Sequence, residues 1–203
     1  MTLHAQLAGV PADQITPQVA AALARVQDEN ALLRAALAEA QARLGEQEAA
    51  ADRDPLTGLA NTRRFEADVD RTVAQVSRHG TTAALLLVDA TDLPSIAARH
   101  GQVAADAALI HVARLLQKLI RTGDLAARLE GDGFGVILDH LDADSACDTA
   151  ERIARCIAAE PLDLGGSRLR VDVQIGVATI LAGDEPQEVL SRARRSAARA
   201  LEF

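Results

Sequence analysis

Apolar residues recur every third or fourth position over residues 17–51, which is the spacing of one face of an amphipathic helix. Thr16 followed by Pro17 is a typical helix start, because Thr caps the N-terminus and Pro suits the first helical position. We therefore predict a long helix from Pro17 to about Ala51. Residues 1–16 are weakly patterned, and we expect them to form either a loose tail or a docking segment.

A heptad repeat fits this helix and predicts a coiled coil. Its seam positions are mostly apolar, namely Val19, Val26, Leu33, Ala40 and Gln47 at d and Leu23, Asn30, Leu37, Leu44 and Ala51 at a. The polar Asn30 favours two parallel strands at some cost in stability, and Glu29 of one chain then faces Arg34 of the other. The alternative is a single amphipathic helix packed on its own domain, which Leu32 outside the seam and Gly45 favour.

The remainder of the chain alternates helical patterns with short apolar runs. We predict helices over residues 62–78, 103–120, 142–159 and 188–201, a short helix near Pro94, and strands over residues 83–88, 124–129, 134–138 and 169–175. The strand 83–88 is continuously apolar, which is typical of a buried central strand, whereas 169–175 alternates and predicts a half-solvated strand. Strands 124–129 and 134–138 flank a tight turn and predict a hairpin. These elements predict an α/β fold that follows the long N-terminal helix.

The composition indicates a globular protein. Of the 203 residues, 49% are hydrophobic and 25% are charged, which excludes a disordered chain and allows a sizeable core. The net charge is −8, and the chain has three Phe but neither Trp nor Tyr. Such a chain lacks the positive surface and the stacking platforms of a nucleic-acid binder, so we expect no nucleic acid among its partners. A small nucleotide ligand stays compatible with this composition, since a local cluster of Arg can bind it.

We expect a cytoplasmic protein that does not insert into a membrane. No apolar run approaches the roughly 18 residues of a membrane span. The N-terminus lacks a basic segment followed by an apolar one, so we expect no signal peptide. Cys147 and Cys156 cannot form a disulfide framework, which is typical of a reducing cytosol, and the five His residues show no metal-binding spacing.

Two carboxylates lie where a metal and a phosphate could bind. Asp89 ends the buried strand, and Asp132 lies between two glycines at the tip of the predicted hairpin. Paired carboxylates at neighbouring strand ends, with glycines that let phosphates approach the backbone, are what Mg²⁺–nucleotide chemistry requires. The alternative is that Asp132 serves the geometry of the turn, as most Asp residues in Gly-rich turns do.

Four motifs follow one another within residues 52–203. They are DPLTGLAN at 54–61, HGQVAAD at 100–106, EGDGF at 130–134 and QIGVA at 174–178. In this order they resemble the D-x-L-T-G-L-x-N, G-H-x-x-G-D, G-G-[DE]-E-F and S-I-G-V-A motifs of the GGDEF family, the bacterial diguanylate cyclases. The resemblance implies a mostly antiparallel, polymerase-palm-like central sheet with helices on both faces, and GTP with Mg²⁺ as the substrate and metal of the family. A coiled coil that leads into the first motif is common in this family.

The resemblance also implies that the active site is degenerate, because the signature turn departs from the family pattern. The turn has the sequence Glu130-Gly131-Asp132-Gly133-Phe134. Glu130 places a negative charge where the family has a Gly beside the GTP phosphates. Gly133 removes the Glu that the family needs for catalysis and metal binding. Asp132, a metal ligand in the family, is kept.

Two further nucleotide-binding residues of the family are missing. Its guanine-reading Asn falls at Ala97, and its Lys after the first strand falls at Pro94. The vestigial residues that remain are Asp106 and Gly131 for GTP and Asp89 and Asp132 for Mg²⁺. A site that keeps one of two contacts to guanine loses most of its base discrimination. The C-terminal helix lacks the Lys of the family but carries three arginines able to touch a phosphate, Arg194, Arg195 and Arg199.

A second nucleotide site resembles the family without such losses. Arg121 and Asp124 match its R-x-x-D inhibitory site, with five residues between Asp124 and the signature turn. The resemblance implies that cyclic di-GMP binds here as an intercalated dimer, with Arg152 of the following helix as a further contact. Arg presents a planar fork to guanine or phosphate, and Asp accepts hydrogen bonds from the N–H edge of guanine. The alternative is that Arg121 and Asp124 form an ordinary ion pair at a helix end.

These observations lead to three hypotheses of function. The first is a catalytically inactive GGDEF protein that needs no cofactor, binds cyclic di-GMP at Arg121 and Asp124, and signals through a parallel homodimer or an unknown protein partner. The second is a weak diguanylate cyclase that uses Mg²⁺ at Asp89 and Asp132, and the third is a ligand-free scaffold. We favour the first, in a chain that consists of a tail (1–16), a coiled-coil dimerisation helix (17–51) and a degenerate GGDEF domain (52–203).

Overall fold

The structure is a computed structural model that describes residues 16–199, apart from the side chains of Leu44 and residues 46–50. The chain divides into two units, Met1–Ala51 and Asp52–Phe203. Within the described residues, the first unit holds one long helix, and the second holds the strands and the other helices. None of the helices described is both long enough and apolar enough to cross a membrane.

Helix α1 (Pro17–Ala51) begins and ends where the heptad pattern predicts. Its N-terminus is capped, since the backbone N–H of Val19 donates to the hydroxyl oxygen of Thr16 at 3.3 Å. The predicted tail, residues 1–16, lies outside the described residues except for Thr16.

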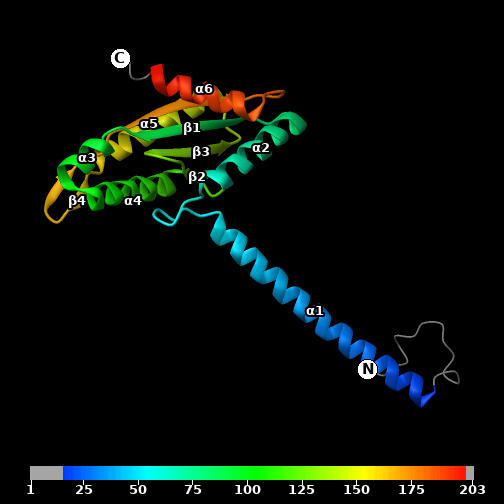
Figure 1. Ribbon diagram of the computed structural model, residues 1–203. Helices are drawn as coiled ribbons and strands as arrows, with labels where there is room; N and C mark the ends of the chain where they lie inside the picture. Colours follow the sequence, from blue (N-terminus) through cyan, green and yellow to red (C-terminus); the bar gives the residue numbers. More distant parts are fainter. Residues whose placement is uncertain (1–15, 200–203) are drawn as a thin grey trace. The chain divides into compact units, whose positions relative to one another are not determined.

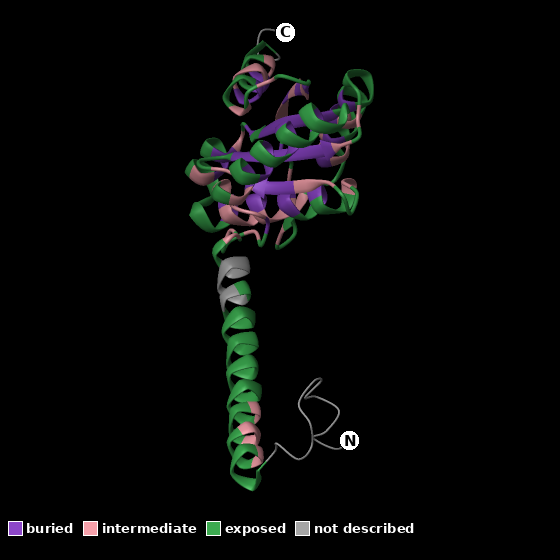
Figure 2. Ribbon diagram, turned by 90° about the vertical axis from the view of Figure 1, so that its right-hand side faces the viewer, coloured by how far each residue is buried: buried purple, intermediate pink, exposed green. Residues whose placement is uncertain are grey.

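The apolar stripe of α1 is exposed in the single chain. Val26, Leu33 and Leu37 of the seam are 56%, 63% and 59% exposed, and Figure 2 shows most of the described helix in the exposed colour. An apolar stripe at heptad spacing on a long helix fits a coiled-coil segment. Leu44 and Gln47 of the predicted seam fall on positions whose side chains are not described.

The second unit is built around a four-stranded antiparallel sheet, as predicted. Its strands lie in the order β2 (Leu125–Arg128), β3 (Gly133–Asp139), β1 (Ala83–Ala90) and β6 (Val173–Ile180). The continuously apolar β1 lies in the centre, paired with β3 on one side and with β6 on the other. This register places Gly133 and Gln174 opposite Asp89, at the end of β1 that adjoins the signature turn.

Helices cover both faces of the sheet (Figure 1). One face is covered by α2 (Thr62–His79) and α6 (Pro186–Arg199), and the other by α3 (Leu93–His100), α4 (Gln102–Leu119) and α5 (Ala143–Ala159). Successive side chains of a strand point to opposite faces, so Leu87 packs beneath α2 and α6 whereas Leu86 packs beneath the other three helices. Asp89 therefore points to the face that α2 and α6 cover.

Two glycines let the helices of this face lie directly on the sheet. A Cβ atom at Gly135 would lie 2.4 Å from the ring of Phe65 in α2. A Cβ atom at Gly176 would lie 2.1 Å from the carbonyl oxygen of Ala193 in α6. A side chain at Gly176 would require the backbone of α6 to shift, whereas one at Gly135 would require the ring of Phe65 to move.

The outer edge of β6 is bonded by side chains of α6. The backbone N–H of Val177 donates to the hydroxyl oxygen of Ser196 at 3.1 Å. Arg192 donates from Nη2 to the carbonyl oxygen of Thr179 at 2.7 Å. The last strand of the described sheet thus has partners for two backbone groups that an edge strand ordinarily leaves unpaired.

The predicted strand over residues 169–175 is not one continuous strand, and only its two ends are in β-structure. Its first residue ends β5 (Ser167–Leu169), which pairs with β4 (Leu162–Leu164) in a separate hairpin, and β6 begins at Val173. The buried Val171 continues the apolar alternation across the connection between the two sheets. Alternation indicates an extended backbone with one buried face, and it does not specify the partner strand.

The other predicted elements of this unit are present, with ends that differ by a few residues. α6 begins at Pro186, ahead of its predicted start, and residues 200 and 201 of the predicted helix lie outside the described residues. Asn61 caps α2 as its side chain accepts from the backbone N–H of Arg64 at 3.0 Å.

Candidate functional site

One arginine holds the signature turn together. Arg128, the last residue of β2, donates from Nη1 to the carbonyl oxygens of Leu129 at 2.9 Å and Gly133 at 2.6 Å. Its other terminal nitrogen donates to the carbonyl oxygen of Gly131. The guanidinium also lies over the ring of Phe134, with 5.1 Å between Cζ and the ring centroid. Because the guanidinium is rigid and planar, these contacts fix the shape of the turn.

Arg128 also connects the DPLTGLAN motif to the signature turn. The backbone N–H of Arg128 donates to the carbonyl oxygen of Ala60 at 2.7 Å, and Ala60 forms a parallel bridge with Ala127 on the outer edge of β2. Burial lowers the pKa of the Arg128 guanidinium, whereas the carboxylates of Asp54 and Asp132 raise it. Residues of two sequence motifs therefore meet at one half-buried cation.

Side-chain hydrogen bonds close the loop that contains the DPLTGLAN motif. Asp54 Oδ1 accepts from the backbone N–H of Thr57 at 2.8 Å and from its hydroxyl at 2.6 Å. Arg53 donates from Nη1 to the carbonyl oxygen of Gly58 at 2.9 Å. Gly58 has φ at 72°, a left-handed conformation that suits glycine. The motif thus builds a closed loop ahead of α2.

The two predicted carboxylates, Asp89 and Asp132, lie together at the end of β1 and the tip of the turn. The backbone N–H of Ala90 donates to the carbonyl oxygen of Asp132 at 3.2 Å, and Asp89 lies opposite Gly133 in the sheet. Burial raises the pKa of the Asp89 carboxyl above its ordinary value, and the charge of Asp132 raises it further. The structure therefore brings together the pair that the sequence assigns to Mg²⁺.

This pair fits the donor chemistry of Mg²⁺. The ion usually binds one or two carboxylates and completes its shell with waters and substrate phosphates, and Asp89 and Asp132 supply the carboxylates. Gly133 has no side chain with which to add a third ligand. Among the described residues, no group of three or more His, Cys, Asp or Glu side chains is placed to hold a metal ion.

A cavity of about 530 Å³ opens beside the carboxylate pair, between α2, α6 and the end of the sheet. Its lining includes both apolar and charged residues, among them Leu87, Leu190, Glu66, Asp89, Glu130 and Arg194. Gly133 also lines it, and a Cβ atom there would lie 3.1 Å from Asp89 Oδ1. A side chain at this position would crowd Asp89, and the glycine leaves the space open.

Two of the three positions assigned to nucleotide recognition have no polar side chain. Ala97 in α3 packs against the core beneath α3, α4 and α5 and has no polar side-chain atom. Pro94 lies in the first turn of α3 and donates no backbone hydrogen bond. Asp106 in α4 accepts one hydrogen bond, from Gln102 Nε2 at 2.8 Å, so its carboxylate keeps acceptor capacity for a nucleotide.

Asp124 organises the loop between α4 and β2. Its Oδ2 accepts from the backbone N–H of Arg121 at 2.9 Å, and its Oδ1 accepts from that of Asp139 at 3.2 Å. The ion pairs among the described residues do not include the Arg121 guanidinium, so the alternative of a helix-end ion pair is wrong for this structure. A carboxylate accepts about four hydrogen bonds, so Asp124 keeps capacity for a ligand.

Arg152 of α5 lies beside the same loop. Its Nη2 donates to the carbonyl oxygen of Leu119, the last residue of α4, at 3.4 Å. The Arg152 side chain is exposed and so is that of Arg121, which follows Leu119 closely in the chain. The predicted contacts of cyclic di-GMP therefore come from neighbouring segments of the fold.

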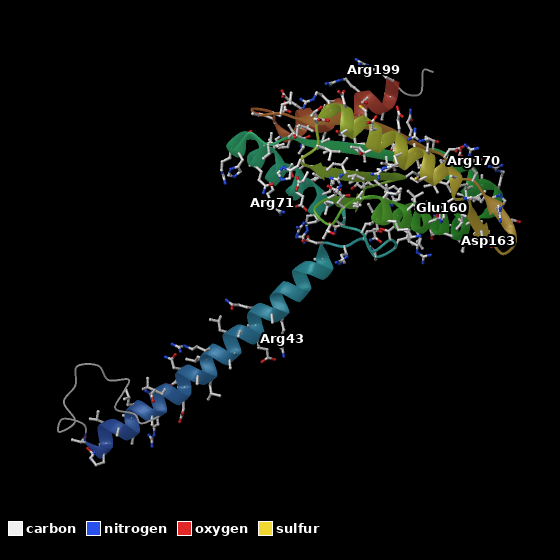
Figure 3. All side chains as sticks on the ribbon, turned by 180° about the vertical axis from the view of Figure 1, so that it is seen from behind. Arg43, Arg71, Glu160, Asp163, Arg170 and Arg199 are labelled. Carbon is white, nitrogen blue, oxygen red and sulfur yellow. The ribbon has the colours of Figure 1, made fainter. Side chains whose placement is uncertain are left out.

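Sequence analysis missed a charged group on α2 beside Asp124. Asp68 is only 6% exposed, accepts from Arg64 Nε at 2.6 Å, and pairs with Arg71, which Figure 3 labels on α2. The hydrogen bond to Asp68 raises the pKa of Arg64. These side chains and Asp124 line a cavity of about 230 Å³. The signal was the spacing of three and four residues between the charges, which an apolar pattern does not register.

The arginines of α6 differ in their contacts. Arg192 Nη1 donates to Asp184 Oδ1 at 2.9 Å, and this hydrogen bonding lowers the pKa of Asp184. Arg194, Arg195 and Arg199 are exposed and take part in no ion pair among the described residues. Figure 3 shows Arg199 at the C-terminal end of α6, whereas Arg194 lines the cavity beside Asp89.

Comparison with known families finds one match to most of the chain. The model of the family described as "Diguanylate cyclase, GGDEF domain" matches residues 51–202. "Diguanylate cyclase TpbB" of Pseudomonas aeruginosa is 35% identical over 158 residues, which is 75% of this chain and 36% of that protein. The chain thus spans about a third of the length of this relative.

Comparison with solved structures finds the same fold. The coiled coil and GGDEF domain of DgcB from Caulobacter crescentus, in complex with c-di-GMP, match with a TM-score of 0.76 at 24% identity over 88% of this chain and 93% of that chain. The GGDEF domain of TpbB from Pseudomonas aeruginosa matches with a TM-score of 0.70 at 30% identity over 74% of this chain and 88% of that chain. The matched structure of DgcB consists of a GGDEF domain together with its coiled coil.

Proposed function

Because the chain belongs to the diguanylate cyclase GGDEF-domain family, we propose that it is a catalytically inactive member that acts as a receptor for cyclic di-GMP. One contrast carries the proposal. The loop of Arg121 and Asp124 keeps its ligand groups in an ordered arrangement, whereas the signature turn has a glycine at position 133.

The loss of catalysis is supported by three features of the decayed site. Gly133 removes a carboxylate for which no neighbour in the turn substitutes. Glu130 adds a negative charge where phosphates would lie, and Ala97 presents no polar atom to guanine. Mg²⁺, when bound, would act as a Lewis acid on phosphate oxygens. Asp89 and Asp132 would hold the ion. The receptor function needs no cofactor, and Mg²⁺ would take part only if GTP binds.

Binding of cyclic di-GMP is supported by the state of the R-x-x-D loop. The Arg121 guanidinium is exposed and can present its planar fork to guanine or phosphate. The loop amides are already held by Asp124, so binding orders little additional backbone. Arg152 adds a second exposed guanidinium beside the loop, suited to a phosphate.

The signal leaves the domain through self-association of α1 or through a protein partner. The exposed seam of α1 supports a parallel homodimer, and Asn30 at an a position supports two strands in one register. A receptor that is dimeric can report ligand binding as a change in the arrangement of its two copies.

A weak diguanylate cyclase is the second candidate, and it is favoured by the retained pair of Asp89 and Asp132. The two carboxylates meet at the end of β1, which suits a metal that bridges to phosphates. The name of the relative TpbB points to the same activity.

Calorimetry of the purified chain with cyclic di-GMP, and separately with GTP and Mg²⁺, tests the proposal. We expect heat of binding with cyclic di-GMP and none with GTP and Mg²⁺. Binding of GTP–Mg²⁺ with formation of cyclic di-GMP above a no-protein control would establish the cyclase instead, and binding of neither would leave the scaffold. Gly133→Glu should not restore turnover, because Ala97 and Pro94 still lack the contacts to guanine and phosphate.

A further inference from the structure

The cavity between α2, α6 and the end of the sheet holds four charges that binding of cyclic di-GMP at Arg121 and Asp124 does not use. Glu66 comes from α2, Asp89 from β1, Glu130 from the turn and Arg194 from α6. None of the four is paired in the ion pairs among the described residues. With three carboxylates and one guanidinium among its residues, the lining has a net charge of two negative units.

The rest of the lining is apolar enough to hold an organic body. Leu87 on the sheet and Leu190 on α6 contribute to the wall. The volume of about 530 Å³ lies within the range of small-molecule pockets, which combine an apolar lining with a few convergent polar groups. The cavity is therefore larger than a hydrated metal ion needs, and its walls suit hydrocarbon.

We propose that this cavity binds a short aliphatic dication, that is, a diamine or an amine with a guanidine at the far end of a methylene chain. Two positive ends match the net charge of the lining and form charge-assisted hydrogen bonds with its carboxylates. The methylene chain covers Leu87 and Leu190. A nucleotide without Mg²⁺ is disfavoured here, because its phosphates would face an excess of carboxylates.

Removal of Arg194 distinguishes a dication from an anion by the direction in which the binding affinity changes. For a dication, the guanidinium of Arg194 is a like charge in the wall, so its removal strengthens binding. For a nucleotide or another anion, Arg194 is the attractive group and its removal weakens binding. The Asp89 carboxylate attracts a dication, so its removal weakens binding. It repels an anion, so its removal strengthens binding.

Calorimetry with putrescine and with agmatine, in a metal-free buffer that contains EDTA, measures the binding. We expect Asp89→Asn to weaken binding about tenfold through loss of a charge-assisted contact, and Arg194→Ala to tighten it by a few fold. Arg114→Ala removes the same charge from an exposed position of α4, on the opposite face, and should leave the affinity unchanged. Gly133→Ala adds a methyl group at the wall and should weaken binding.

Several results would overturn the proposal. They are absence of binding to both putrescine and agmatine, weaker binding of putrescine by the Arg194→Ala variant, or binding of Mg²⁺ in EDTA-free buffer that putrescine does not compete with. Circular dichroism of each variant establishes that it is folded, and Asp89→Asn is close in shape to the native residue. Cyclic di-GMP titrated into the same variants reports on the loop at Arg121 independently, so failure of one proposal is distinguishable from failure of the other.

Discussion

Asp124 and Arg121 differ in how they can be tested, although they belong to one loop. The Asp124 carboxylate accepts from two backbone amides, so a substitution there disturbs both the loop and any ligand contact. The Arg121 guanidinium has no such role among the described residues, so its removal leaves the loop in place. The arginine is therefore the cleaner probe of the ligand, and Asp124→Ala measures binding and loop order together.

Arg121→Ala should weaken cyclic di-GMP binding by roughly ten- to a hundredfold, because one charge-assisted contact is lost. Arg152→Ala should cost less, as a contact at the periphery of the loop. Asp132→Ala should leave the affinity nearly unchanged, because that residue belongs to the signature turn. Titration calorimetry compares the three variants. A larger loss for Asp132→Ala than for Arg121→Ala would move the ligand to the turn.

The raised pKa of Asp89 predicts a stability that falls as pH rises. The folded protein binds the proton of the Asp89 carboxyl more tightly than the unfolded chain does, in which Asp titrates at about pH 4. Unfolding free energy therefore decreases from about pH 4 up to the folded pKa and then stays level with respect to this group. Asp89→Asn should remove that decrease. Urea midpoints of both proteins across the acid range measure it, and parallel curves would contradict the assignment.

At the scale of elements, the sequence predicted what local pattern controls. Asn61 marks the start of α2, and the apolar run 83–88 marks the central strand. Asp89 and Asp132 were predicted as a pair because neighbouring strand ends meet at one edge. Arg128 was missed, since its role depends on carbonyl oxygens of a turn that no periodicity reports.

The cavity beside Asp89 was also beyond sequence analysis. Its walls come from α2 and α6, which are far apart in the amino-acid sequence. No pattern within either helix indicates that the other packs beside it. The hairpin of β4 and β5 was missed for a different reason, because its short strands carry too few residues to establish a period.

Gly176→Ala should destabilise the second unit by about 3 kcal/mol, near the upper end for overpacking. The added Cβ would lie 2.1 Å from a backbone oxygen of α6, so the whole helix must move rather than one side chain. Gly45→Ala adds the same methyl group in open space on α1 and should not lower stability. Urea unfolding followed by circular dichroism compares them. Equal midpoints for Gly176→Ala and the wild type would show that α6 is not seated against β6.

At the scale of the whole molecule, the net charge of −8 opposes the approach of two copies. Salt screens this repulsion, since the Debye length shortens to about 8 Å at physiological ionic strength. The apolar seam of α1 gains from burial at any salt concentration. Self-association through α1 should therefore strengthen as salt is raised from a low level.

The full chain should be a dimer, and Asn30→Leu should raise its stability while broadening its choice of oligomer. A buried Asn at an a position costs stability but specifies two strands in register. Multi-angle light scattering and thermal unfolding measure the two effects. A chain that stays monomeric at high micromolar concentration would exclude the coiled-coil dimer.

The bonded edges of the sheet have a consequence for behaviour at high concentration. An exposed edge strand is a template on which another chain can add a strand, and such addition leads to domain swapping and aggregates. Here Ser196 and Arg192 occupy backbone groups of β6, and Ala60 occupies the outer side of β2. These bonds occupy part of the backbone at both edges of the sheet, so an incoming strand cannot form a full ladder there without displacing them.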